Sequence, residues 1–282
     1  MSNSQSEDIQ PAFPPEIEEY IFSLCLQDGL DSCKPLILVA KRVYQWLRPH
    51  FYKVAIFHDG KRQCGRPRFD SRLLKTHGPY VRHILFWGMR GIDISEETRG
   101  SHVQKHATYL SWCPNVVEVA LWDFDTSYHE NLIDQLLALP VKRLSFDITL
   151  FHNELTNSSI TKPISFRSVT HLHLIGKEIT LQVKKLNKYL PSITHIAINE
   201  ARHLSAQGIL DCWGNQLEIL IWYINRSSSN HESGVPDDPR IVIIDQPRDY
   251  VEDWYRATED GPGSVWRIAE AEVKGRHRCR VD

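Results

Sequence analysis

The chain has 282 residues, of which 41% are hydrophobic, and 33 Lys and Arg residues nearly balance 35 Asp and Glu residues, for a net charge of -2. A protein that binds nucleic acid mainly by charge carries a basic excess, so this balance excludes that class. No apolar run is long enough for a membrane span, and the first ten residues lack the apolar core of a signal peptide. We therefore expect a globular protein of the cytoplasm, the nucleus or both, with no membrane partner.

Motifs of the common enzyme classes are missing from the sequence. It contains no P-loop, G-x-G-x-x-G, G-x-S-x-G or H-E-x-x-H motif. The six cysteines are scattered without any C-x-x-C pair, and a disulfide framework is not expected in a reducing compartment. We therefore predict a protein that is not an enzyme and that needs no cofactor and no metal.

After a tail at 1–10 that we expect to be disordered, residues 11–53 are predicted to form a small helical unit. Pro14 and Pro15 stand where a helix begins, because proline fits the first helical turn. Apolar residues then recur with helical spacing at Ile17, Ile21, Phe22 and Leu24. About 40 residues are too few for a stable core of their own. The unit must therefore pack on something.

A short pattern of two apolar residues three positions apart recurs between residues 54 and 246. Its eight occurrences are Val54/Phe57, Val81/Ile84, Val116/Val119, Val141/Leu144, Val169/Leu172, Ile193/Ile196, Leu217/Leu220 and Ile241/Ile244. All the intervals but one fall in the range of about 20–29 residues that is typical of leucine-rich repeats. The exception, between Val81 and Val116, is expected to hold a loop insertion.

The segments between these occurrences support the same interpretation. Several carry apolar residues with helical spacing, for example Leu132, Ile133 and Leu136. Prolines precede five of the expected strands, and proline ends a helix and favours extended backbone before it. Strand, helix, proline and strand in succession predict an α/β fold with parallel strands. We expect an irregular leucine-rich-repeat-like solenoid at 54–246.

Residues 247–282 do not follow the repeat. Two short amphipathic helices are predicted from apolar residues with helical spacing, first Tyr250, Val251 and Trp254, and then Val265 and Trp266. We expect these helices to cap the open end of the solenoid and to be followed by a basic tail.

The sequence around the first unit resembles a known motif. PPEI at 14–17 and LVAKRVYQW at 38–46 resemble the F-box, by which substrate receptors attach to the Skp-type adaptor of cullin-RING ubiquitin ligases. Together with the irregular repeats that follow, the chain is similar to F-box-like proteins abundant in mushroom-forming fungi. The resemblance implies an F-box-like unit whose adaptor-binding residues are Pro14, Pro15, Ile17, Ile21, Phe22 and Val39. The alternative is that these residues only pack on the first repeat.

Alternate residues of each expected strand are predicted to form one face of the sheet. One row across this face is His83, Glu118, Arg143, His171, His195 and Ile219. Because aromatic and imidazole groups gather there, we expect the face to bind a target protein through Trp87, Trp122, His171, His173, His195 and Tyr223. The alternative is that C-terminal or inserted segments cover the face. Three imidazoles can bind zinc, but no carboxylate or thiolate completes the set in sequence, and we predict no metal site.

These expectations combine into a receptor that acts without catalysis. The F-box-like unit would bind the ligase adaptor, and the repeats would bind a target that the sequence does not identify. The alternatives are a repeat-based interaction module without ligase association and, third, a metal-dependent hydrolase on the histidine cluster. Basic residues at 41–75 are interpreted as a solvated or partner-facing surface, and we do not expect nucleic acid as a partner.

Overall fold

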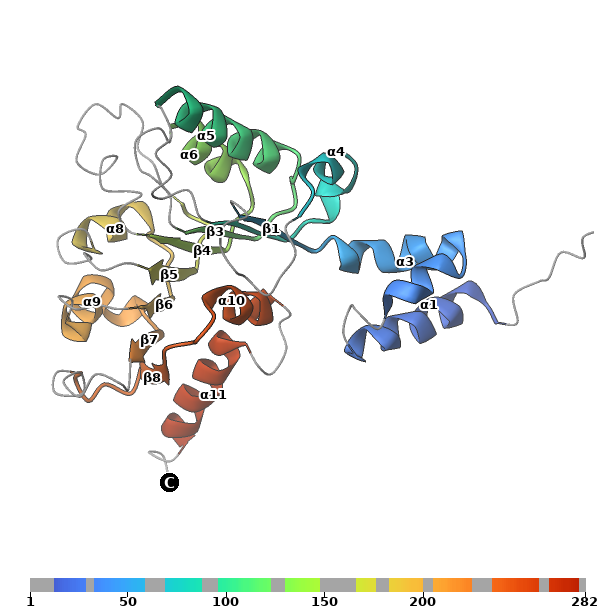
Figure 1. Ribbon diagram of the computed structural model, residues 1–282. Helices are drawn as coiled ribbons and strands as arrows, with labels where there is room; N and C mark the ends of the chain where they lie inside the picture. Colours follow the sequence, from blue (N-terminus) through green and yellow to red (C-terminus); the bar gives the residue numbers. More distant parts are fainter. Residues whose placement is uncertain are drawn as a thin grey trace, which may run out of the picture. The chain divides into compact units, whose positions relative to one another are not determined.

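The computed structural model describes ten stretches of the chain, in two compact units, Met1–Lys53 and Val54–Asp282 (Figure 1). The described residues are 13–28, 33–58, 69–87, 96–122, 130–147, 166–175, 183–199, 205–224, 235–258 and 264–278. The expected tail at 1–10 lies outside them. No helix within these stretches is long and apolar enough to cross a membrane.

The first unit is helical where it is described. Its elements are α1 (Pro15–Leu24), η1 (Cys25–Asp28), η2 (Lys34–Leu38) and α3 (Lys41–Phe51). Pro15 opens α1, where the missing N–H of proline has no helical partner to lose. The core of the unit is small and consists of Cys33, Val43 and Leu47, with half-buried side chains around them.

The second unit is built on one all-parallel sheet of eight strands, in which the order in space is the order in the chain. The strands are β1 (Val54–His58), β2 (His83–Trp87), β3 (Glu118–Trp122), β4 (Arg143–Asp147), β5 (His171–Ile175), β6 (His195–Ile198), β7 (Ile219–Ile224) and β8 (Ile241–Asp245). This confirms the prediction of an α/β fold with parallel strands.

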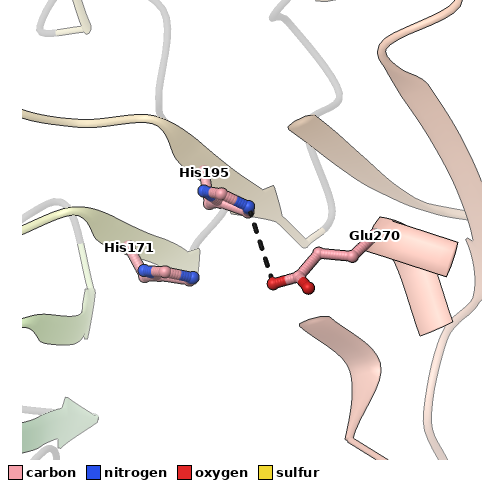
Figure 2. Close-up of side chains that lie close together, drawn as sticks. All are labelled: His171, His195 and Glu270. Atoms are coloured by element: carbon pink, nitrogen blue, oxygen red, sulfur yellow. Dashed lines mark ion pairs between the residues drawn. The ribbon is translucent and has the colours of Figure 1, made fainter. Parts of the chain in front are cut away.

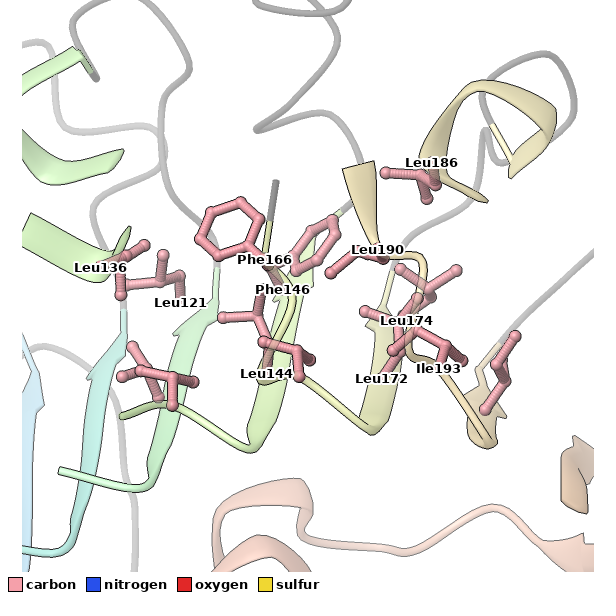
Figure 3. Close-up of a cluster of buried hydrophobic side chains, with 14 of the residues drawn as sticks. Leu121, Leu136, Leu144, Phe146, Phe166, Leu172, Leu174, Leu186, Leu190 and Ile193 are labelled. Carbon is pink, nitrogen blue, oxygen red and sulfur yellow. The ribbon is translucent and has the colours of Figure 1, made fainter. Parts of the chain in front are cut away.

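Helices that connect successive strands cover one face of this sheet (Figure 1). They are α4 (Leu74–His77), α5 (Glu96–Ser111), α6 (Glu130–Ala138), α8 (Val183–Tyr189) and α9 (Ala206–Trp213), with short turns η3 (Ser71–Leu73), η4 (Gly78–Tyr80) and η6 (Gly214–Gln216). Apolar strand residues such as Leu144 and Leu172 pack there with Leu186 and Leu190 in the main core (Figure 3). The interval between Val81 and Val116 contains the helix α5. Residues 88–95 of this interval, in which a loop insertion is expected, lie outside the described residues.

The predicted register is confirmed in the six middle strands and corrected in the first and the last. In the middle strands the first apolar residue of the pattern, such as Val81, precedes the strand and is buried. Since side chains three positions apart in one strand point to opposite faces, Val54 and Phe57 cannot share the core. Ala55 pairs with Ile84 in place of Phe57, a shift of two residues, and Ile241 pairs with Leu220 in place of Ile244, a shift of three.

The two C-terminal helices are placed differently from the expectation. α10 (Tyr250–Thr258) and α11 (Val265–Arg278) lie against the face of the sheet opposite the connecting helices (Figure 1). Trp254 of α10 and Trp266 of α11 are both buried in apolar clusters with strand residues of that face. The expected cap of the open end was therefore wrong, because the apolar sides of these helices bury the exposed sheet face.

Candidate functional site

The first unit presents an apolar surface that its own core does not cover. Leu38 is 85% exposed and Val39 65% exposed, and Ile17 and Ile21 on α1 are 47% and 43% exposed. Most apolar side chains of this size are buried in folded proteins. An uncovered group of them on a unit of this size is typical of a binding surface.

One half-buried ion pair links α1 to α3. The Glu18 carboxylate accepts hydrogen bonds from the Arg42 Nε at 2.8 Å and the Arg42 Nη2 at 3.3 Å. Glu18 is 9% exposed, so the pair lies on the inner side of α1. Ile17, the residue before Glu18, points about 100° away from it around the helix and is exposed.

Five of the six residues that the F-box resemblance implies are exposed: Pro14, Pro15, Ile17, Ile21 and Val39. The sixth, Phe22, is half-buried and packs on Trp46, with ring centroids 6.2 Å apart. Phe22 therefore belongs in part to the core of the unit.

Basic residues at 41–75 are tied in part by local ion pairs. Besides the pair of Arg42 with Glu18, Arg72 donates to the Asp70 carboxylate at 2.8 Å. Lys61, Arg62, Arg66 and Arg68 lie outside the described residues. Within the described part of 41–75 one carboxylate, that of Asp70, offsets these basic residues.

In the second unit, α10 and α11 cover the face that was expected to bind a target. Trp122 is 3% exposed and meets the ring of Trp254 at 6.3 Å, while its Nε1 donates to the Ser145 Oγ at 2.8 Å. Tyr223 is buried with its hydroxyl 3.4 Å from the Asp253 Oδ2. Trp87 is half-buried in the same cluster as Trp122. The structure therefore supports the alternative in which C-terminal segments cover this face.

Charged and polar groups are buried along the row that crosses this face. The Glu118 carboxylate lies 2.9 Å from the His83 Nδ1 and 3.5 Å from the Arg143 Nε. The sequence placed Glu118 in this row but assigned it no role. Its carboxylate places a negative charge beside the guanidinium of Arg143, whose side chain is 19% exposed.

His173 lies between the aromatic groups of this face. Its ring is 6.5 Å from that of Trp122 and 5.8 Å from that of Tyr223. Burial lowers the pKa of His173 to about 4, although Asn199 and Glu118 act in the opposite direction. The imidazole is therefore neutral at physiological pH. Burial also raises the pKa of Asp253 on α10.

A cavity of about 20 Å³ lies between the strands and the helices α10 and α11. Its polar lining includes Glu118, Ser145, His173, Tyr223 and Asp253. Such a volume has room for about one water molecule, whereas sites for small organic ligands are on the order of 300 Å³ or more. This cavity can hold a bridging water, but it cannot hold an organic substrate.

His171 and His195 form the remaining part of the predicted set. They occupy equivalent positions of β5 and β6, and a third group, Glu270 of α11, reaches them. The ligand atoms of the three side chains all lie within 4.8 Å of one another. The structure therefore separates His173 from the predicted trio and brings in Glu270, which strand periodicity could not indicate because Glu270 lies on a helix.

Comparisons with known proteins give no match for this chain. No protein-family model matches it, and neither a curated protein nor a solved structure does.

Proposed function

We propose that this chain is an F-box-like substrate receptor that links a target protein to a cullin-RING ubiquitin ligase through a Skp-type adaptor. In this proposal residues 11–53 form the F-box-like unit. Residues 54–246 form an irregular leucine-rich-repeat-like solenoid that recruits the target.

The observation that carries the proposal is the uncovered apolar surface of the first unit. Ile17, Ile21 and Val39 are exposed, and all three are at positions that the F-box resemblance assigns to adaptor contact. Apolar side chains on a helix that lie in a partner's groove are a recurrent mode of recognition, and they drive association by leaving water. The same residues offer little to a polar ligand.

The sheet of the second unit supports the remaining part of the proposal. Its strands follow one another in chain order, and each is paired in parallel with the next. This arrangement is the one that stacked βα repeats produce. Because α10 and α11 cover Trp122 and Tyr223, target binding would use other surfaces of this unit.

The mechanism follows from geometry and requires no catalytic group in this chain. Holding a target beside a ubiquitin-charged partner raises the effective concentration of the reacting groups. The receptor would supply position alone.

Calorimetric titration of the purified full chain with a Skp-type adaptor tests the proposal. We expect Ile21→Asp to weaken binding by about 10- to 100-fold, since an anchor residue at an interface contributes roughly 1–3 kcal/mol. Ile268→Asp is the matched control, because Ile268 is 47% exposed on α11 of the other unit. It should bind like the unaltered chain.

Two results would count against the proposal. One is no binding of the unaltered chain by the adaptor. The other is equal affinity of the Ile21→Asp and Ile268→Asp variants. Circular dichroism of both variants establishes that any loss reflects the surface and not unfolding.

A further inference from the structure

Two imidazoles are stacked on neighbouring strands beneath α11. His171 of β5 pairs in register with His195 of β6. Their ring centroids are 4.2 Å apart and their planes differ by 14°. In Figure 2 both rings point one nitrogen toward the carboxylate of Glu270. Stacked rings of this kind present two ligand nitrogens side by side.

The threonine that precedes each histidine fixes which nitrogen is free. The His171 Nδ1 is 2.9 Å from the Thr170 Oγ1, and the His195 Nδ1 is 2.7 Å from the Thr194 Oγ1. Each threonine hydroxyl in turn lies 3.4 Å from a backbone carbonyl, to which it donates. We assign the tautomer from this chain of contacts, in which the ring Nδ1–H donates to the threonine oxygen. The lone pair is then on Nε2.

Glu270 supplies an oxygen to the same place from α11. Its Oε1 is 3.9 Å from the His195 Nε2, while its Oε2 is 3.8 Å from the Lys274 Nζ (Figure 2). The first distance is too long for a hydrogen bond. The Glu270 side chain is 37% exposed, so it has room to turn toward the two rings.

The indole of Trp266 packs against both imidazole rings. Its indole meets His171 edge to face at 5.0 Å and His195 at 6.1 Å. Trp266 is buried, so the histidines are enclosed by α11 on one side and their carboxylate partner comes from the same helix. The cluster thus joins two strands and one helix.

We propose that His171, His195 and Glu270 bind one divalent transition-metal ion, for which Zn²⁺ is the best match, between the sheet and α11. Imidazole nitrogen and carboxylate oxygen are ligands that zinc prefers, at about 2.0–2.2 Å. Ligand atoms around tetrahedral zinc are roughly 3.4 Å apart, so the present ligand atoms would approach one another by up to about 1.4 Å, and the nearly parallel imidazoles would rotate until their in-plane lone pairs converge on the ion. A water molecule takes the fourth position. The threonine contacts are the outer hydrogen bonds that commonly orient metal-binding histidines.

Such an ion would fasten α11 to β5 and β6. The proposal is independent of adaptor binding, because all three ligands belong to the second unit.

The test uses the purified full chain, first stripped with a chelator and then titrated with Zn²⁺ in a calorimeter. We expect one ion per chain, and a rise in Tm of roughly 5 °C or more at a hundredfold excess over Kd. Co²⁺ in place of Zn²⁺ should give the visible absorption of a tetrahedral site.

Glu270→Gln should weaken binding of Zn²⁺ at least tenfold while leaving the Tm of the metal-free chain nearly unchanged. Glu272→Gln is the matched control, since Glu272 is an exposed carboxylate on the same helix. It should retain full affinity. Failure of the unaltered chain to bind one ion, or equal affinity in the Glu270→Gln and Glu272→Gln variants, would overturn the proposal.

Discussion

Replacing Trp254 by alanine tests how firmly α10 covers the sheet face. Trp254 is 4% exposed and packs against Trp122 in a cluster that includes Leu85 and Ala120. Its indole Nε1 makes no hydrogen bond within the described residues, so truncation removes packing and no polar contact. The expected change in stability therefore comes from the lost apolar contact and from the cavity left behind.

Truncation of a buried tryptophan to alanine costs about 3–5 kcal/mol in free energy of unfolding. For a unit of this size each kcal/mol lowers Tm by about 2–4 °C, so Trp254→Ala should lower Tm by roughly 6–20 °C. Urea unfolding followed by circular dichroism gives the free energy, and a thermal scan gives Tm. The near-ultraviolet spectrum should change as well, because the contact with Trp122 is lost.

Ile243→Ala provides the control for this variant. Ile243 is 47% exposed on β8, and its truncation should change the free energy of unfolding by less than about 0.5 kcal/mol. A cost below about 1 kcal/mol for Trp254→Ala, or a cost no larger than that of the control, would refute the position of α10 on the sheet.

Further predictions concern the interior of the second unit. Because the pKa of His173 is lowered to about 4 from 6.5, its neutral form stabilises the fold above pH 6.5, and this stabilisation is lost as pH falls toward 4. In metal-free urea unfolding, His173→Phe should reduce the loss of stability over that range by about 3 kcal/mol, and an unchanged pH profile would contradict the assignment. Glu118→Gln removes the negative charge that faces His83 and the largely buried Arg143. It should lower the free energy of unfolding in urea by about 3–5 kcal/mol. A change near zero would contradict the role given to this carboxylate. Gly78→Ala should lower Tm markedly, because a Cβ there would lie 2.1 Å from the Trp112 carbonyl oxygen. Gly275→Ala in α11 places its Cβ in open space and should raise Tm slightly. Equal effects of the two substitutions on Tm would argue against the close approach at Gly78.

The strands of the second unit could be predicted because burial of side chains on both faces of the sheet produces a regular spacing of apolar residues along the sequence. Val81 and Ile84 illustrate the pattern, in which a buried residue precedes the strand and a second one points into the core. Where the strand itself starts at the first apolar residue, as at Val54, the same pattern of apolar residues gives a register shifted by two residues. The spacing of apolar residues alone does not show at which residue a strand begins.

The cover of the sheet face could not be predicted in the same way. The spacing of Trp254 and Trp266 indicates an apolar side of a helix, but it does not say which apolar surface that side will meet. The same limit applies to Glu270, which approaches His171 and His195 only after α11 folds onto the sheet. Sequence reasoning found the two histidines through strand register and missed Glu270.

The exposed residues of the first unit follow from its size. A core made of Cys33, Val43 and Leu47 cannot cover every apolar side chain on α1 and around η2. Sequence could therefore predict that a surface needing a partner would remain there. What that partner is follows only from the F-box resemblance, and it needs a direct measurement.

Affinity purification of the full chain from cells, with mass spectrometry of what accompanies it, tests the receptor proposal most directly. We expect the Skp-type adaptor and the cullin to be recovered with the unaltered chain and with Ile268→Asp, and to be lost with Ile21→Asp. Recovery of other proteins without any ligase subunit, or ligase subunits that persist with Ile21→Asp, would contradict it.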